Sequence, residues 1–167
     1  MQVVRLSLSR ATSRGSPQVL VRSRLRRASF LRPAIESLAQ KILTAAGEPG
    51  AELSLDLVGD RRMRRLNRQY RGQDLPTDVL AFPMRPVGPA SFLLGDVVIS
   101  LHTAARHAAA DGHSVEHELA KLVIHGVLHL VGYDHERSEP EARRMRRKER
   151  AILRSLMPIP KLVRRDG

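Results

Sequence analysis

The sequence predicts one globular domain in which helices and strands are mixed along the chain. Its 167 residues suffice for a single domain with a buried core, and 42% of them are hydrophobic. Segments with alternating apolar and polar residues, as in strands, are interspersed with segments whose apolar residues recur at the spacing of a helix. Aromatic residues make up only 3% of the chain, so we expect a core of Leu, Val, Ile and Ala.

The first half of the chain predicts two strands and two helices. Residues 18–23 fit a short strand, and Pro33 stands where a helix can begin. The apolar stripe of that helix would consist of Ile35, Leu38, Ala39, Ile42 and Leu43. Residues 53–57 place leucine at every second position, as in a half-buried strand, and Asp60 can cap a second helix that continues to Tyr70.

Two further strands are predicted around the middle of the chain. Residues 77–82 fit a strand that Pro83 stops, because proline cannot donate a hydrogen bond to a neighbouring strand. Residues 85–91 are rich in Pro and Gly and predict a loop. Residues 93–99 fit a strand that a Gly-Asp pair interrupts.

Three helices are predicted in the remainder of the chain. Ser100 is a suitable cap for a helix that ends near Ala110, and Ser114 for the next one, which carries several histidines. The last helix spans about residues 139–156, and we expect the chain after Pro158 to fray.

Residues 1–16 differ in composition from the rest of the chain. They contain arginines and serines but no acidic residue, and the first acidic residue of the whole sequence is Glu36. A disordered or weakly ordered extension is the favoured interpretation and an organelle transit peptide the second; an RNA-binding arm or a start codon placed too far upstream is also open. We therefore expect the domain to span residues 17–157, followed by a basic tail over residues 158–167.

The chain is strongly basic, with a formal net charge of +12, and only four of its 29 basic residues are lysines. A GC-rich genome or heat adaptation can explain Arg in place of Lys, but not the excess of positive over negative charge. We therefore expect a polyanionic partner, in the first place a nucleic acid. No apolar run approaches the ~20 residues of a membrane span, and the absence of cysteine excludes a disulfide framework.

The most informative segment is residues 125–135, HGVLHLVGYDH. His125 and His129 are four residues apart and therefore share one face of a helix. Gly132 ends that helix, and the turn after it can present His135 as a third ligand. Three imidazoles without any cysteine are typical of catalytic zinc, which keeps one position for water, whereas a structural site is closed by four protein ligands. Two histidines at this spacing also occur on helix surfaces, but this helix is too apolar to be a surface helix.

Four segments together resemble the YbeY family of bacterial and organellar ribosomal RNA maturation factors. They are LNRQYRG at 66–72, PTDVLAFP at 76–83, LGDVVIS at 94–100 and HGVLHLVGYDH at 125–135. The resemblance extends from about residue 18 to about residue 157. It implies an α+β fold: a small, mostly parallel four-stranded sheet packed with about five helices, one of them a metal-binding helix similar to that of the zincins.

The resemblance also implies roles for individual residues. His125, His129 and His135 would bind one metal ion per chain, usually taken as zinc, although another divalent transition metal is possible. Arg71 would be a functional basic residue in the cleft, and we count it with His125 as catalytic, since a guanidinium can bind a phosphate through two hydrogen bonds. The predicted RNA-binding residues are Arg65, Arg68 and Arg71, and for the first two a merely solvated helix face is the alternative.

The residues next to the histidines restrict which reactions the site can catalyse. Zincin peptidases carry a general-base Glu directly after the first histidine, and Gly126 occupies that position here. Metal-activated water and metal-assisted attack by the RNA 2′-hydroxyl both fit the pattern. Asp134 and Asp96 are candidates for a carboxylate that orients a ligand histidine. The equally open alternative is that Asp134 only caps the turn and Asp96 only bends the strand. The remaining histidines are expected at the surface or at helix ends: His102, His107, His113 and His117.

The predicted function is that of a zinc-dependent, single-strand-specific endoribonuclease that matures the 3′ end of small-subunit ribosomal RNA in ribosome biogenesis. Its partners would be ribosomal RNA, the small ribosomal subunit and possible ribosomal or assembly proteins, with no membrane and no small-molecule cofactor. We expect a bacterial cytoplasmic protein, or an organellar one if residues 1–16 are a transit peptide. The alternatives are a non-catalytic ribosome-assembly factor with a structural metal and a metallopeptidase.

Overall fold

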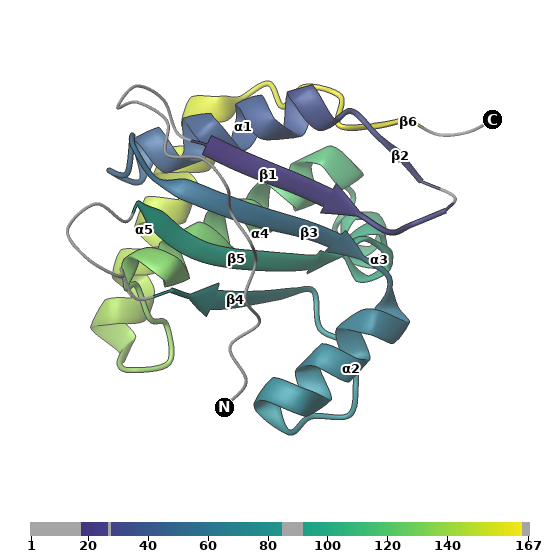
Figure 1. Cartoon of the computed structure of the whole chain (residues 1–167). Helices are drawn as coiled ribbons and strands as arrows, with labels where there is room; N and C mark the ends of the chain where they lie inside the picture. Colours follow the sequence, from purple (N-terminus) through teal and green to yellow (C-terminus); the bar gives the residue numbers. More distant parts are fainter. Residues whose placement is uncertain (1–17, 27, 85–91, 165–167) are drawn as a thin grey trace.

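The computed structural model describes residues 18–26, 28–84 and 92–164, and it is built around one four-stranded sheet (Figure 1). The strand order is β1-β3-β5-β4. Strands β1, β3 and β5 run parallel, and β4 pairs antiparallel with β5. Their bounds are β1 Gln18–Ser23, β3 Glu52–Val58, β4 Val79–Pro83 and β5 Leu93–Ser100.

Helices pack on both faces of this sheet, most of them on one face. Helices α1, α4 and α5 pack on one face, where they share the main core with leucines and valines of β1, β3 and β5 (Figure 1). Helix α2 packs on the other face through Met63, beside Val58 and Val98. The helix bounds are α1 Arg32–Ala45, α2 Asp60–Arg71, α3 Leu101–Asp111, α4 Val115–Val131 and α5 Glu139–Leu156. The predicted α+β fold, with a mostly parallel four-stranded sheet and about five helices, is confirmed.

The helices form where their periodicity and caps predict. The buried residues of α1 are the five of its predicted apolar stripe: Ile35, Leu38, Ala39, Ile42 and Leu43. At the start of α3 the Ser100 hydroxyl accepts the Thr103 N–H, and at the start of α4 the Ser114 hydroxyl accepts the His117 N–H at 3.1 Å. Both caps satisfy backbone donors that would otherwise lack a partner. Helix α5 has the predicted bounds.

Asp60 is not the N-cap that the sequence suggests. Gly59 holds that position, and Asp60 is the first residue of α2. Its carboxylate instead accepts hydrogen bonds from Ser100 (2.6 Å) and Arg106 (2.7 Å), among others, and so ties α2 to the end of β5 and to α3. Burial alone raises the pKa of Asp60, but the hydrogen bonds from Arg106, Ser100 and Thr103 outweigh it and lower the pKa to about 2.

Strand β5 is continuous rather than interrupted at its Gly-Asp pair. The register against β3 shifts there, so that Leu94 has no partner between Glu52 and Leu53. Gly95 has a φ of +149°, and a Cβ at this position would collide with the Phe82 carbonyl oxygen on β4. Glycine is therefore what allows β4 and β5 to pair closely at this bulge.

The expectation that the chain frays after Pro158 is wrong for the described residues, which extend to Arg164. Leu162 is only 1% exposed, and its carbonyl accepts the Leu31 N–H at 2.9 Å. The next two residues form β6 (Val163–Arg164), which pairs antiparallel with β2 (Ser29–Phe30). The tail remains ordered here because it contains two apolar residues. Leu162 belongs to the main core and Val163 packs against it. The predicted extension over 1–16 and the loop over 85–91 lie outside the described residues.

Among the described residues, none of the helices combines the length and the apolar character needed to cross a membrane.

Candidate metal centre

The three histidines of the 125–135 segment come together at the C-terminal end of α4. His125 and His129 lie one turn apart on one face of the helix, and their Nε2 atoms are 3.2 Å apart. Gly132 ends α4 with a φ of +108°, and the turn that follows returns His135 to the other two rings. The ring centroids are 4.7 to 5.3 Å apart, and one nitrogen from each ring lies within 4.8 Å of the others. These residues could therefore hold a metal ion.

The histidine cluster lies partly open to solvent, and its environment favours the uncharged form of His129. The side chains of His125 and His135 are 30% and 43% exposed, so the cluster is neither sealed in the core nor fully hydrated. Burial, and after it the neighbouring His125 and His135, lower the pKa of His129. A lowered pKa leaves the neutral ring dominant at neutral pH, and only a neutral ring offers a lone pair to a cation.

A carboxylate from α5 orients the first of these rings. His125 Nδ1 and Glu149 Oε1 are 2.5 Å apart, which is a short hydrogen bond. When Nδ1 carries the proton and donates it to Glu149, the Nε2 lone pair of His125 is left facing the other two rings. Glu149 is thus the orienting carboxylate.

The two carboxylates proposed from the sequence for this orienting role serve other groups. Asp134 accepts the Glu136 N–H at 2.9 Å and so stabilises the turn that carries His135. Asp96 lies on β5, where burial raises its pKa and a hydrogen bond with Ser54 opposes that rise. Glu149 was missed because it is 24 residues from His125 and stands within a run of basic residues that looks like a solvated helix face. No local spacing signal could have found it.

Gly126, the residue after His125, faces the sheet and not the histidine cluster. A Cβ built on Gly126 would lie 2.7 Å from Val97 Cγ1 and 2.9 Å from Cγ2, because α4 packs directly on β5 at this point. Both Gly126 and Val97 are buried. The position that carries the general-base Glu in zincin peptidases is therefore filled by the sheet, with no room for a carboxylate.

Arg71 reaches the cluster through an acidic residue. It is the last residue of α2, and its Nη2 lies 3.7 Å from Glu136 Oε1, which is itself 3.8 Å from His135 Nε2. Glu136 is 67% exposed and Arg71 46%, so this is a loose pair at the edge of the site that an incoming anion can replace. The end of α2 and the histidines thus border the same open region.

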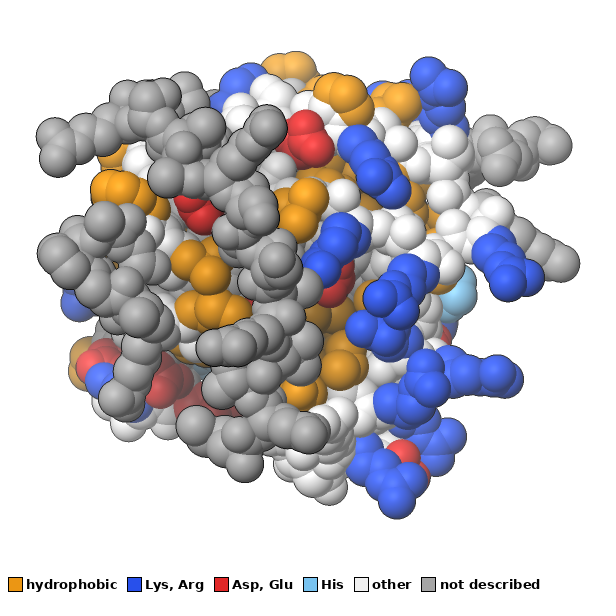
Figure 2. All heavy atoms as spheres, viewed as in Figure 1, with side chains coloured by type: hydrophobic (Ala, Val, Ile, Leu, Met, Phe, Trp, Pro, Cys, Tyr) orange, Lys and Arg blue, Asp and Glu red, His pale blue; other side chains and the backbone are white. Residues whose placement is uncertain are grey.

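Arg65 and Arg68 are exposed on α2, where basic side chains gather at the lower right of the molecule (Figure 2). Within the described part of the chain, no hydrogen bond or ion pair links either residue to the histidines. They can contribute to the local positive potential, whereas Arg71 alone of the three is tied to the cluster through Glu136.

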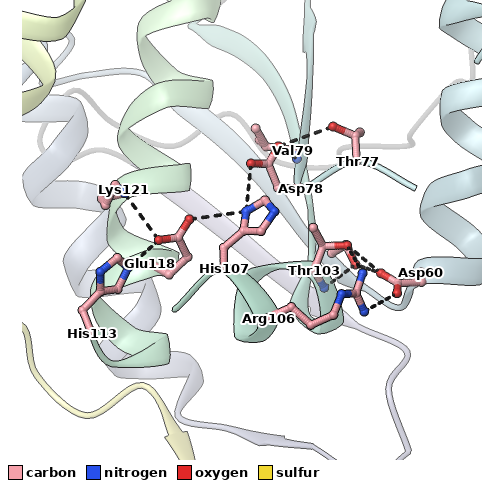
Figure 3. A network of polar contacts seen from close by, with 11 residues as sticks. Asp60, Thr77, Asp78, Val79, Thr103, Arg106, His107, His113, Glu118 and Lys121 are labelled. Atoms are coloured by element: carbon pink, nitrogen blue, oxygen red, sulfur yellow. Dashed lines mark hydrogen bonds and ion pairs between the residues drawn. The ribbon is translucent and has the colours of Figure 1, made fainter. Parts of the chain in front are cut away.

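A second polar network surrounds Glu118, which shares the histidine face of α4. Its side chain is only 5% exposed and is compensated by His113 at 2.6 Å and Lys121 at 3.5 Å. His107 lies between Glu118 and Asp78, at 3.9 and 3.6 Å (Figure 3). His113 is therefore not only a helix-end residue, because its Nε2 forms a hydrogen bond with a buried carboxylate that would be costly to leave unpaired.

Comparisons with known proteins agree on one family. The sequence profile described as "Endoribonuclease YbeY" matches residues 22–157. A curated protein named Endoribonuclease YbeY from Anaeromyxobacter sp. (strain Fw109-5) is 48% identical over 133 residues, covering 80% of this chain and 69% of that protein. One of the same name from Geobacter metallireducens is 46% identical over 141 residues, covering 81% and 93%. A solution structure of a Thermotoga maritima protein superposes with a TM-score of 0.58 at 29% identity, covering 84% and 88% of the two chains.

Proposed function

The chain belongs to the YbeY endoribonuclease family, and on this premise we propose that it is a zinc-dependent endoribonuclease that cleaves single-stranded ribosomal RNA. The observation that carries the proposal is the convergence of three partly exposed imidazoles, His125, His129 and His135. Three neutral nitrogen donors and an open side fit one zinc ion per chain with a free position, as in catalytic sites. Another divalent transition metal with nitrogen affinity would fit the same donors.

The catalytic roles in this proposal divide between the metal and the chain. A bound zinc ion would supply Lewis-acid polarisation of a phosphate oxygen or a bound water whose pKa is lowered to roughly 7. Glu149 keeps a proton on His125 Nδ1, which holds the opposite nitrogen free for the ion. Arg71 exchanges the loose contact with Glu136 for a phosphate of the substrate and stabilises the charge that develops there.

RNA is a better substrate for this site than a peptide. The net charge of +12 favours a polyanion, and exposed Arg65 and Arg68 stand on the helix that ends at Arg71. The peptidase alternative requires a general base where Gly126 packs against Val97. We propose that the substrate strand is the 3′ end of small-subunit ribosomal RNA, with the small subunit and its assembly proteins as partners. Such a substrate places the protein where ribosomes assemble, in the bacterial cytoplasm.

Removal and return of the metal test the proposal. Protein stripped with a chelator should cleave neither single-stranded nor double-stranded RNA, and one equivalent of zinc should restore cleavage of the single strand only. Metal content by mass spectrometry, RNA products on a gel and a peptide library in parallel give the readouts. Full metal occupancy with no cleavage of any RNA would instead favour an assembly factor with a structural metal. Cleavage of peptides would support the metallopeptidase alternative.

Glu149→Ala should weaken zinc binding by about 10–100-fold, the usual cost of removing a partner of a ligand histidine. The reason is that His125 loses the acceptor that selects its tautomer and holds its ring. Competition with a chromogenic chelator measures the zinc dissociation constant. Glu149→Gln keeps an acceptor oxygen and should lose less.

The matched control for Glu149→Ala is Glu139→Ala, which removes an exposed carboxylate from the first turn of the same helix. Equal zinc affinities in the Glu149→Ala and Glu139→Ala proteins would show that Glu149 does not position His125.

A further inference from the structure

A pocket of about 280 Å³ lies between the N-terminal part of α4 and the C-terminal part of α5, away from the histidine cluster. It is lined by His117, Arg150, Leu153, Arg154 and Met157. We propose that this pocket binds a nucleotide of the same RNA strand that is cleaved at the histidine cluster, with its phosphate on the two arginines and its base on the apolar lining residues. This inference rests on the proposed function and extends it to a substrate subsite.

The pocket surface is mostly apolar, and two of its five lining residues are arginines. In the described part of the chain, no carboxylate lies within ion-pair distance of Arg150 or Arg154, whereas Arg22, Arg64 and Arg106 each have an acidic partner. Within that part of the chain, neither charge is paired with an acidic side chain, and Arg150 Nε donates a hydrogen bond to the Arg146 carbonyl oxygen at 3.4 Å.

The apolar residues of the pocket lining are Leu153 and Met157, and Met157 is 53% exposed although it is large and hydrophobic. Methionine is polarisable and makes favourable contacts with aromatic rings, so it suits a nucleobase.

His117 adds a ring to the pocket without adding charge. Burial, and after it the neighbouring His113 and Lys121, lower the pKa of His117, so its neutral form dominates at neutral pH. The His113 and His117 ring centroids are 4.7 Å apart, so the two rings are neighbours at the wall of the pocket. A neutral ring at the wall of the pocket can stack on a base or donate a hydrogen bond to it.

The pocket and the histidine cluster are built on the same two helices. On α4, His117 precedes His125 by eight residues, which is about 12 Å along the axis. On α5, Glu149 contacts His125 while the next residue, Arg150, lines the pocket. A stacked strand at roughly 3.4 Å per nucleotide covers that distance in three or four nucleotides. Along the helix axis, the pocket is therefore within reach of a short strand whose scissile phosphate lies at the histidines.

A row of arginines along α5 favours RNA over an acidic peptide as the occupant. Residues three and four apart share a helix flank, and one flank of α5 carries exposed basic residues along most of its length. They are Arg143, Arg146, Arg147, Arg150 and Arg154. A phosphate backbone presents a charge at every nucleotide and can follow such a row, whereas a peptide that only fills the pocket would leave most of it unused.

The decisive experiment compares Arg150→Glu/Arg154→Glu with wild type on RNA strands of two lengths that share one cleavage site. On a strand of about twelve nucleotides the variant should show KM raised by about tenfold or more, the size of losing a stacked base and its phosphate contact. KM should rise only for strands that are long enough to reach the pocket. The short strand, with two nucleotides on each side of the cleavage site, should therefore have the same KM with the variant as with wild type. For the variant, the plot of log RNA affinity against log salt concentration should be less steep than for wild type, with the magnitude of its slope smaller by roughly 1 to 2.

Control variants separate the pocket from general charge effects. Arg32→Glu/Lys41→Glu makes the same charge change at exposed positions of α1 and should leave KM near the wild-type value. Met157→Ser should weaken binding of the long strand without changing the salt slope, because it removes only apolar contact. Circular dichroism and thermal melting confirm that each variant is folded.

A folded Arg150→Glu/Arg154→Glu protein with wild-type KM on the long strand would overturn the inference. An equal rise in KM for the α1 control would also overturn it, because only net charge would then matter. The inference would likewise fail if the Arg150→Glu/Arg154→Glu protein lost binding to an acidic peptide but kept binding to RNA. If wild-type protein cleaves no RNA, the proposed function fails by itself. Fluorescence anisotropy with the twelve-nucleotide strand then still decides whether the pocket binds RNA.

Discussion

Replacing His125 with alanine should reduce the zinc content from about one per chain to near zero and lower RNA cleavage by at least about 100-fold. Loss of a partner of a ligand histidine already costs about 10–100-fold in affinity or activity, so loss of the ligand should cost more. His125 is also the ring that Glu149 holds, so its removal leaves that carboxylate without its hydrogen-bond partner. Metal analysis and cleavage of a single-stranded RNA, each at equal protein concentration, measure the two effects.

Two further variants show whether this loss is specific. His102→Ala removes an exposed histidine of α3 that is outside the cluster, and it should keep both metal and activity. Arg71→Ala should keep the metal and lose cleavage, because Arg71 is proposed to bind the phosphate and not the ion. A His125→Ala protein that retains one zinc and normal cleavage would contradict the proposed metal centre.

Replacing Gly126 with glutamate should destabilise the fold strongly and should not create a peptidase. The new side chain would start 2.7 Å from a methyl of Val97, in a buried contact between α4 and β5. Overpacking a core of this kind costs typically about 1–3 kcal/mol, and burial of an unpaired carboxylate adds a penalty that is larger still. Chemical denaturation should therefore show a fall of several kcal/mol in the free energy of unfolding, and peptide cleavage should stay absent.

A smaller pair of substitutions keeps this prediction testable if the glutamate variant does not fold. Alanine is favoured over glycine within a helix by about 1 kcal/mol, but the clash with Val97 should exceed that gain, so Gly126→Ala should be destabilising. In a Val97→Ala background the methyl groups that clash are gone, and Gly126→Ala should then be stabilising. A stabilising effect of Gly126→Ala in the wild-type background would show that α4 and β5 are not in tight contact there.

Features with a local cause could be predicted from the sequence. The apolar stripe of α1, the serine caps at Ser100 and Ser114, and the bounds of α5 follow from side chains within one or two helical turns. Two features that depend on a distant segment were predicted wrongly. The carboxylate of Asp60 bonds to residues 40 and more positions away, and the tail after Pro158 pairs with β2 at the other end of the chain.

The same division holds at the candidate site. The sequence alone places His125 and His129 on one helix face and ends that helix at Gly132, because helical periodicity and a left-handed glycine are properties of the local chain. Only the tertiary structure shows that Glu149 orients His125, that Glu136 joins His135 to Arg71, and that Val97 closes the space beside Gly126. These contacts depend on which surfaces of α2, α5 and β5 meet the histidine helix. Local propensity and spacing carry no information about that choice, since packing of the whole core decides it.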